Sequence, residues 1–221
     1  MIIVIIPAFN EGKRVGDVVQ SSLAHCDRVI VVDDGSTDDT AAVARRAGAE
    51  VISHSQNLGA GAATMTGIEA ARRMRASVAV TIDADGQHSA EEIPLFLAPI
   101  KEGRADIVFA NRFSRKNVIP LIRRLYNAVG NLITFLVSGL WVNDSQCGFK
   151  AFGPIALQDL DIRMSGFEFC TEIVREARQH RWRIIEVPTK VVYSEYTLAK
   201  GQSFANGVKT ALKILLRSFL R

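Results

Sequence analysis

Cysteine is scarce in this sequence, with three residues among 221. Cys26, Cys147 and Cys170 lie far apart, and no two of them have a Cys-x-x-Cys spacing. An odd, widely spaced set argues against a disulfide framework and against a cysteine-ligated zinc site, and it fits a reducing compartment. The sequence near Met1 shows no basic segment followed by an apolar segment and a cleavage site, so we expect no secretory signal.

Several common catalytic motifs are also missing. We find no GxxxxGK[ST] loop for nucleotide phosphates, no GxSxG nucleophile turn and no HExxH zinc motif. The glycine-rich stretch 57–64 fails the GxGxxG pattern at Thr64 and does not follow the first strand, so we predict that its small residues allow close helix packing. The four histidines are isolated, and we expect even His88, the one nearest the polar clusters described below, to be a bystander.

What the sequence does contain is an ordinary globular composition, with 48% apolar and 23% charged residues. A chain of 221 residues is long enough for a sizeable core, and we expect one domain spanning 1–221. The net charge of +4 is mild, but residues 200–221 contain no acid and hold Lys200, Lys209, Lys213, Arg217 and Arg221. This asymmetry predicts an anionic partner, and in the absence of a recognised motif we expect no nucleic acid.

The first half of the sequence alternates between strand and helix patterns. Apolar runs predict strands at 2–6, 28–32, 50–53, 77–82 and 106–110. Helical spacing of apolar or small residues follows at 15–23, 41–44, 59–74 and 91–100. This alternation predicts an α/β fold in which a mostly parallel sheet is covered by helices on both faces.

The second half is less regular. We predict one or two apolar helices in 120–142, a strand at 148–152, a helix at 167–180, and a strand pair or long strand in 183–193 broken near Pro188. The uncharged stretch 125–142 is at the short limit for spanning a bilayer and contains two asparagines, so we expect interfacial helices and no membrane span. Residues 203–221 predict a basic amphipathic helix, which fits either a bilayer interface or core packing with a solvated basic side.

Polar clusters follow four of the predicted strands, at 7–11, 33–39, 83–88 and 111–112. In parallel sheets, ligands bind beyond the carboxyl ends of the strands. Asp83 and Asp85 are two hard oxygen donors that suit Mg²⁺ or Mn²⁺, and Gln87 offers a third oxygen. A solvated turn is the alternative for this Asp-x-Asp motif, and its position after an apolar strand favours the metal.

The cluster at 33–39 also allows two interpretations. Asp34 is placed to accept hydrogen bonds from a nucleobase or a ribose hydroxyl. The alternative is that Ser36, Thr37 or Asp38 caps the amino end of the following helix.

Taken together, the motifs resemble family 2 glycosyltransferases, and most closely their dolichyl-phosphate mannosyltransferase (polyprenyl-phosphate glycosyltransferase) group. The ordered set that carries the resemblance is IPAFNE (6–11), VVDDGSTD (31–38), NLGAGAA (57–63), DADGQH (83–88), ANRF (110–113), DSQCGFK (144–150) and EVP (186–188). The resemblance implies the A-type glycosyltransferase fold, with a nucleotide-sugar-binding half at 1–115 and an acceptor-binding and membrane-contact half at 116–221.

The resemblance also implies a set of site residues. Those implied to bind the nucleotide sugar are Pro7, Ala8, Phe9, Glu11, Val32, Asp34, Asp83, Ala84, Asp85, Arg112 and Lys200. Asp83, Asp85 and Gln87 would hold Mg²⁺ or Mn²⁺, and Asp85, Arg112 and Lys200 would be catalytic. Arg123, Arg124 and Asn127 would bind the acceptor phosphate. The chain departs from the family at Asn127, where a serine is usual, and around Lys200, where the usual clamp of arginine and lysine is altered.

The implied activity is inverting transfer of a sugar from GDP-mannose or a UDP-sugar to a polyprenyl or dolichyl phosphate. We expect it at the cytoplasmic face of a membrane, in a peripheral protein, and we allow for a membrane-protein partner. A phosphate acceptor is largely ionised at neutral pH, so we expect no catalytic base. Glu168 and Glu172 are the nearest candidates for one, and we interpret them as surface acids of a helix. The alternatives are transfer to a hydroxyl of a glycolipid or polysaccharide, a nucleotidyltransferase, and a catalytically inactive membrane-associated scaffold.

Overall fold

A computed structural model describes residues 1–192 of the chain. Lys200 and the basic helix predicted at 203–221 therefore lie outside the described residues. The strands are β1 (Ile2–Ala8), β2 (Arg28–Asp33), β3 (Glu50–Ser53), β4 (Val78–Thr81), β5 (Ile107–Asn111), β6 (Lys150–Phe152) and β7 (Ile184–Pro188). The helices are α1 (Val15–Leu23), α2 (Thr40–Arg46), α3 (Ala60–Arg73), the 3₁₀ helix η1 (Ala90–Glu92), α4 (Ile93–Lys101), α5 (Leu121–Ser138), α6 (Pro154–Asp159) and α7 (Phe169–Gln179).

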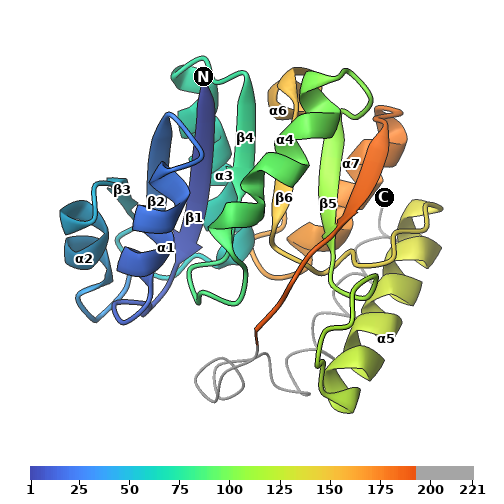
Figure 1. Cartoon of the computed structure of the whole chain (residues 1–221), viewed down its shortest axis with the longest axis horizontal. Helices are drawn as coiled ribbons and strands as arrows, with labels where there is room; N and C mark the ends of the chain where they lie inside the picture. The colour runs from blue at the N-terminus through green and yellow to red at the C-terminus, as the bar shows by residue number, and fades with distance from the viewer. Residues whose placement is uncertain (193–221) are drawn as a thin grey trace.

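The described strands form one mixed sheet in the order β3-β2-β1-β4-β6-β5-β7. All neighbouring pairs are parallel except those that β6 makes with β4 and β5. Consequently β1, β2, β4 and β5 all point the same way and end at the same edge, at the bottom of Figure 1. The chain runs outward from β1 through β2 to β3 and then returns to add β4 on the other side of β1. The β1/β4 boundary is therefore the switch point at which such sheets bind ligands.

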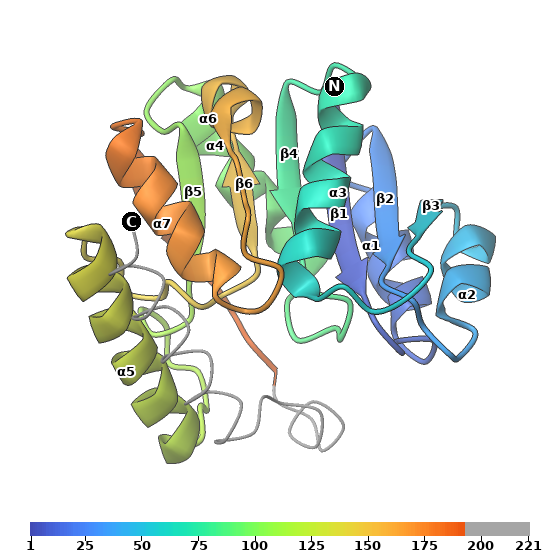
Figure 2. The ribbon, with the colours of Figure 1, turned by 180° about the vertical axis from the view of Figure 1, so that it is seen from behind.

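Helices cover both faces of the sheet. One core joins the sheet to α1 and α4, which lie on the near side in Figure 1, and includes Val4, Val19 and Phe96. The other core joins it to α3, α6 and α7, seen from behind in Figure 2. The central strands are buried on both faces, and every residue of β4 and β5 is buried. This is why their sequences read as continuous apolar runs and not as alternating ones.

The predicted elements of the first half are confirmed, with boundaries shifted by a few residues. The helix predicted at 91–100 begins as the 3₁₀ turn η1 before α4, and the apolar region 120–142 forms the single helix α5. The short helix α6 was not predicted. The strand predicted within 183–193 is β7, which is one strand and ends at Pro188.

Close packing of the small residues in α3 is also confirmed. A Cβ added at Gly61 would overlap the carbonyl oxygen of Met164, and one added at Gly67 would overlap the side chain of Ile5. The backbone N–H of Gly61 donates to the carbonyl oxygen of Ser165, 2.8 Å away. The glycine-rich stretch therefore fixes the loop before α7 against α3.

Helix α5 lies at the outside of the molecule and packs on α7 (Figure 2). The hydroxyl groups of Thr134 and Thr171 are 2.9 Å apart at this buried contact. The opposite side of α5 and its flanks expose large apolar residues, namely Val118, Leu121, Ile122, Leu125, Val129, Leu132, Leu136 and Trp141. Within residues 1–192, no helix has both the length and the hydropathy required to cross a bilayer.

Candidate active site

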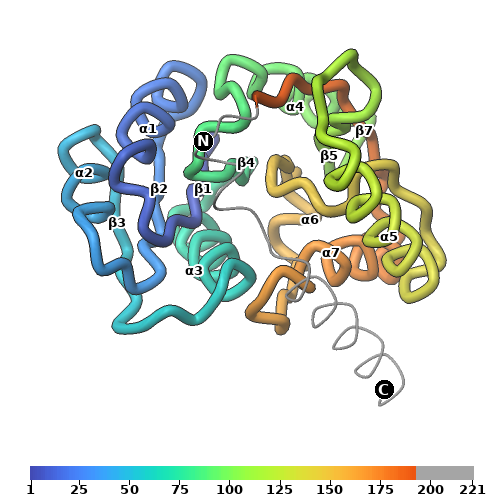
Figure 3. The backbone as a smooth tube through the Cα atoms, turned by 90° about the horizontal axis from the view of Figure 1, so that it is seen from below, coloured from blue at the N-terminus to red at the C-terminus, as the bar shows by residue number. Residues whose placement is uncertain are grey.

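The polar clusters predicted from the sequence follow β1, β2, β4 and β5, and the parallel alignment of these strands brings them to one edge of the sheet. Figure 3 views the molecule from this edge and shows the loops after β1 and β4 close to the middle of the molecule. The expected arrangement of the candidate site at this edge is therefore present in the structure.

The loops after β1 and β2 are joined by hydrogen bonds. The backbone N–H of Asn10 donates to Oγ of Ser36 at 2.9 Å, and the N–H of Thr37 donates to Oδ1 of Asn10 at 2.8 Å. The N–H of Glu11 donates to the hydroxyl of Thr40 at 2.8 Å. Ser36 and Thr37 are thus used between loops and do not cap α2. Of the proposed caps, Asp38 comes nearest, since its carboxylate accepts from the N–H of Thr40, the first residue of α2.

Asp34 is buried and holds the loop before α3. Its carboxylate accepts hydrogen bonds from the N–H groups of Leu58 and Gly59, at 2.9 and 2.8 Å, and lies 2.7 Å from Nδ1 of His54. The other ring nitrogen of His54 lies 3.0 Å from the hydroxyl of Thr66. The carboxylate is therefore fixed in position, and the role of Asp34 in binding a nucleoside stays a prediction.

Asp83 and Asp85 lie just beyond β4. The alternation of side chains along an extended chain predicts both carboxylates on one face, but this prediction is wrong in part, because Asp85 lies in a turn that continues through Gly86, at φ +73°. Its carboxylate accepts the backbone N–H of Gln87 at 2.9 Å. Burial, followed by the negative charge of Asp83, raises the pKa of Asp85 to about 6, and the charge of Glu11 acts in the same direction.

These carboxylates fit a divalent cation. Asp83, Asp85 and Glu11 bring negative charge into one partly buried place, and their mutual repulsion is visible in the raised pKa of Asp85. Oxygen donors of this kind are the ligands that Mg²⁺ and Mn²⁺ prefer. Within residues 1–192, no group of three His, Cys, Asp or Glu side chains is arranged to hold a metal.

Arg112 lies on the loop after β5, and its charge, like those of Asp83 and Asp85, affects the pKa of His88. Its guanidinium makes a bidentate pair with the fully buried Asp144, in which Nε and Nη2 each lie 2.7 Å from a carboxylate oxygen. Nη2 also donates to Oδ1 of Asn127 on α5 at 3.2 Å. The guanidinium is thus held in a fixed plane between the sheet edge and the helix predicted to bind the acceptor.

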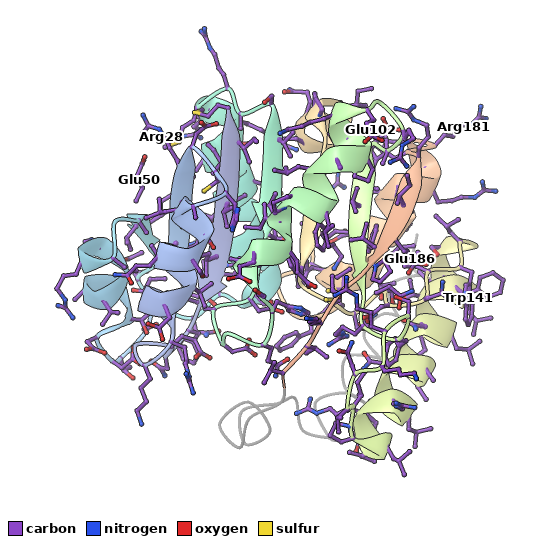
Figure 4. All side chains as sticks on the ribbon, in the orientation of Figure 1. Arg28, Glu50, Glu102, Trp141, Arg181 and Glu186 are labelled. Carbon is purple, nitrogen blue, oxygen red and sulfur yellow. The ribbon has the colours of Figure 1, made fainter. Side chains whose placement is uncertain are left out.

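Glu186 on β7 holds the backbone of Asp144, the partner of this arginine. Its carboxylate accepts the backbone N–H of Asn143 at 2.9 Å and that of Asp144 at 3.3 Å. The side chain of Asn143 in turn accepts the indole N–H of Trp141 at 3.1 Å. Figure 4 shows Glu186 and Trp141 on the α5 side of the molecule, far from the Arg28–Glu50 pair at the other end of the sheet. Asp144 and Glu186 belong to the motifs of the sequence analysis, but no role was predicted for them.

The remaining predicted residues differ in exposure. Phe9 is 44% exposed, so its ring is free to contact a ligand, whereas the side chain of Val32 is fully buried in the core. Ala8 is buried at the end of β1, and Ala84 is buried in the turn that follows β4. Arg123 and Arg124 lie in the first turn of α5, one half-buried and one exposed, and the carbonyl oxygen of Arg123 accepts the side-chain N–H of Asn127 at 2.9 Å.

Our interpretation of Glu168 and Glu172 as surface acids is wrong, because both are buried, with exposed fractions of 5% and 2%. The carboxylate of Glu172 accepts the backbone N–H groups of Arg163 and Met164 at 2.9 and 2.8 Å. Glu172 therefore anchors the loop before α7, a structural task that does not require it to accept a proton.

The residues behind Asp83 were also missed. His88 is buried, its ring lies 5.4 Å from that of Phe149, and Nε2 is 3.3 Å from Sγ of Cys147. Burial lowers the pKa of His88, which favours a neutral packing role and agrees with the expected bystander. Gly148 touches the carboxylate of Asp83. Lys150, two residues further along the chain, is fully buried.

Comparison with known proteins supports one family. The family model for Glycosyl transferase family 2 matches residues 3–159. The chain is 35% identical over 240 residues to a UDP-N-acetylglucosamine–dolichyl-phosphate N-acetylglucosaminyltransferase of Methanococcus voltae, with 98% of this chain and 95% of the relative covered. It is 26% identical over 224 residues to a polyprenol monophosphomannose synthase of Mycolicibacterium smegmatis, with 95% and 83% covered.

The fold is shared with solved structures. The glucosyl-3-phosphoglycerate synthase of Mycobacterium tuberculosis, crystallised with Mn²⁺, UDP and glucosyl-3-phosphoglycerate, matches with a TM-score of 0.72 and 21% identity. The match covers all of this chain (100%) and 78% of the synthase. At this identity the match establishes the predicted A-type fold.

The raised pKa of Asp85 predicts how stability depends on pH in the metal-free protein. Between the ordinary value of 3.8 and about 6, the folded state retains a proton that the unfolded state has lost, so the free energy of unfolding falls as pH rises through this window. The Asp85→Asn substitution should remove this loss of stability. At pH 7.5, with a chelator present to remove metal ions, the variant should be more stable than wild type by about 2–3 kcal/mol. Urea unfolding from pH 4 to 8 measures the difference.

Asp159→Asn is the matched control, because Asp159 is exposed at the end of α6. It should leave the pH dependence unchanged. An Asp85→Asn protein that is less stable than wild type at pH 7.5 without metal would contradict the raised pKa of Asp85.

Proposed function

Because the chain belongs to glycosyl transferase family 2, we propose that this glycosyltransferase moves a sugar from a nucleoside-diphosphate donor to a polyprenyl phosphate, with inversion and with the help of Mg²⁺ or Mn²⁺. The observation that carries the proposal is the pair of neighbouring carboxylates, Asp83 and Asp85, at the switch point of the sheet. The relatives named above, whose acceptors are polyprenyl or dolichyl phosphates, support the choice of acceptor.

The donor would bind across the loops after β1 and β2. Phe9 offers an exposed ring to a nucleobase, and the carboxylate of Asp34 is held in place by two backbone N–H groups. The hydrogen bonds between these loops keep them in one arrangement before a ligand arrives. A preorganised site loses less conformational entropy on binding. Both a uridine and a guanosine donor are compatible with these groups.

Asp83 and Asp85, with Gln87 beside them, would hold the divalent cation. When bound, the cation would neutralise the negative charge that develops on the leaving diphosphate. Asp85 would need to be ionised to ligate it, and its pKa of about 6 means that this is the prevailing form near neutral pH. Lys200, which lies outside the described residues, is proposed as a further cation over the diphosphate.

Arg112 would stabilise charge on a phosphate from a fixed position. Its side chain is aligned by Asp144 and reaches Asn127 on α5, next to Arg123 and Arg124. A guanidinium in this place is suited to orient the acceptor phosphate towards the donor sugar. The acceptor is its own nucleophile in this scheme, which agrees with the structural use of Glu172.

The apolar outer face of α5 would lie against the bilayer and receive the lipid chain of the acceptor. Leu121 is 82% exposed and Leu136 is 67% exposed, which is costly in water and favourable in a membrane interface. Arg123 and Arg124 lie at the end of the same helix, where an anionic headgroup would meet them. The protein would therefore be peripheral, and we propose the cytoplasmic face because that is where nucleotide sugars are available as substrates.

The central experiment is a thermal-shift panel of UDP-, GDP- and dTDP-sugars, each with and without Mn²⁺. One donor should raise the melting temperature with Mn²⁺, since a ligand at 100 times its Kd adds about 2.7 kcal/mol to stability. Asp83→Asn should abolish the part of the shift that depends on Mn²⁺. That donor should then glycosylate a polyprenyl phosphate in detergent. Transfer only to sugar hydroxyls would refute the acceptor, and no shift with any donor would indicate an inactive scaffold.

Replacing Arg112 by lysine tests the role of the fixed guanidinium. The lysine keeps the charge but loses the bidentate pair with Asp144, so the rate of transfer should fall by about 10²–10³. Arg115→Lys is the control, because Arg115 pairs with Glu92 and not with Asp144, and its rate should stay within a few-fold of wild type. Equal rates for wild type and Arg112→Lys would remove Arg112 from the mechanism.

Membrane contact through α5 predicts that Leu121→Asp and Leu136→Asp each weaken vesicle binding about tenfold or more, because each removes a leucine from the apolar contact. Cosedimentation of the full chain with vesicles of anionic phospholipid measures this. Leu95→Asp, an exposed leucine of α4 on another part of the surface, should bind as wild type does. If all three variants bind equally, α5 is not the contact surface.

A further inference from the structure

Lys150 is a fully buried lysine without an acidic partner. Its ammonium donates to the carbonyl oxygen of Cys147, lies 3.8 Å from Sγ of Cys170 and is 5.2 Å from the centre of the Phe109 ring. None of the ion pairs within residues 1–192 includes it. Burying a charge without an ion-pair partner lowers the stability of the folded state, so we expect this lysine to have a function that offsets the cost.

The turn that Lys150 holds lies directly against the proposed metal ligand Asp83. A Cβ added at Gly148 would overlap the carboxylate of Asp83, and its three nearest atoms all belong to that carboxylate. Only a glycine leaves room for Asp83 at this point, and the reason is space, since Gly148 is not among the residues with positive φ. The backbone at Cys147 and Gly148 therefore forms the surface on which the Asp83 side chain rests.

A second side chain fastens the same turn. The hydroxyl of Thr81, the last residue of β4, donates to the carbonyl oxygen of Gly148 at 2.7 Å. Thr81 and Lys150 are partners across the β4–β6 pair, so both side chains leave the sheet on the same face. Successive carbonyls of the turn, those of Cys147 and Gly148, are thus each held by a buried donor.

The charges of Lys150 and Asp83 also affect the pKa of the same thiol, that of Cys170. The positive charge of Lys150 lowers the pKa of Cys170 while the negative charge of Asp83 raises it, although burial dominates and the pKa is raised overall. The lysine therefore lies within electrostatic range of the metal-binding edge and supplies a positive charge behind it.

We propose that Thr81 and Lys150 are positioning residues that hold the Cys147–Gly148 turn against Asp83 and thereby fix this carboxylate for a divalent cation. The inference rests on the proposed function, because it assigns Asp83 to the metal. The two residues act through the turn and do not touch the ion. Loss of either hydrogen bond lets the turn move away from β4, and Asp83 then loses the surface that orients it.

The test is Mn²⁺ binding to the full chain in the presence of UDP or GDP, followed by electron paramagnetic resonance of the free ion and measured against the same nucleotide without protein. Thr81→Val keeps the shape of the side chain and removes its donor, and Lys150→Met keeps an unbranched side chain of similar length without the charge. Each should weaken Mn²⁺ binding about 10–100-fold, the usual effect of losing a group that orients a metal ligand. Thr64→Val is the matched control, since Thr64 is a buried threonine of α3 whose hydroxyl donates to the carbonyl oxygen of Ala60. It should bind Mn²⁺ as wild type does.

The outcomes separate this inference from the proposed function. Wild-type protein that binds no Mn²⁺ would overturn the metal assignment and the inference together. Wild-type binding matched by Thr81→Val, with the variant shown to be folded by circular dichroism, would overturn the inference alone. Tighter binding by Lys150→Met would also overturn it, because it would mean that the ammonium mainly repels the cation. If Lys150→Met does not fold, Thr81→Val decides.

Discussion

The two carboxylates at the carboxyl end of β4 repel each other, and the rest of the site is arranged around holding them together. Their repulsion is offset locally only by weak means, such as the backbone N–H of Gln87 that donates to Asp85. The free energy needed to keep them close comes from the core, where β4 is buried on all sides between β1 and β6. A well-packed central strand is thus what allows an electrostatically unfavourable pair to persist in the folded protein.

Positive charge lies near this pair of carboxylates. Arg112 pairs with Asp144, and Lys150 is buried behind the turn that supports Asp83. The same arrangement links the sheet to the outer helix, since Glu186, Asp144, Arg112 and Asn127 form a continuous set of hydrogen bonds from β7 to α5.

The two sides of the proposed site are built differently. On the proposed donor side, hydrogen bonds of 2.8–2.9 Å join the loops after β1 and β2 and fix Asp34 to the loop before α3. On the acceptor side, α5 packs on α7 through one face and exposes an apolar surface on the other. A rigid donor site beside an exposed apolar helix is an arrangement that suits one water-soluble substrate and one lipid substrate.

The sequence alone was sufficient for the sheet and the family, and for placing the proposed metal ligands at one edge of that sheet. Buried parallel strands are continuous apolar runs, and the carboxyl ends of such strands place Pro7, Asp34, Asp83 and Arg112 at one edge whatever the details of packing. Only the tertiary structure revealed what holds those residues in place. Asp144 and Gly148 act through contacts with residues 32 to 67 positions away in the chain, and no local pattern encodes such contacts. For the same reason Glu172, a surface acid by its sequence pattern, is a buried anchor: its neighbours come from the fold, and burial depends on what packs against a residue and not on the residue itself.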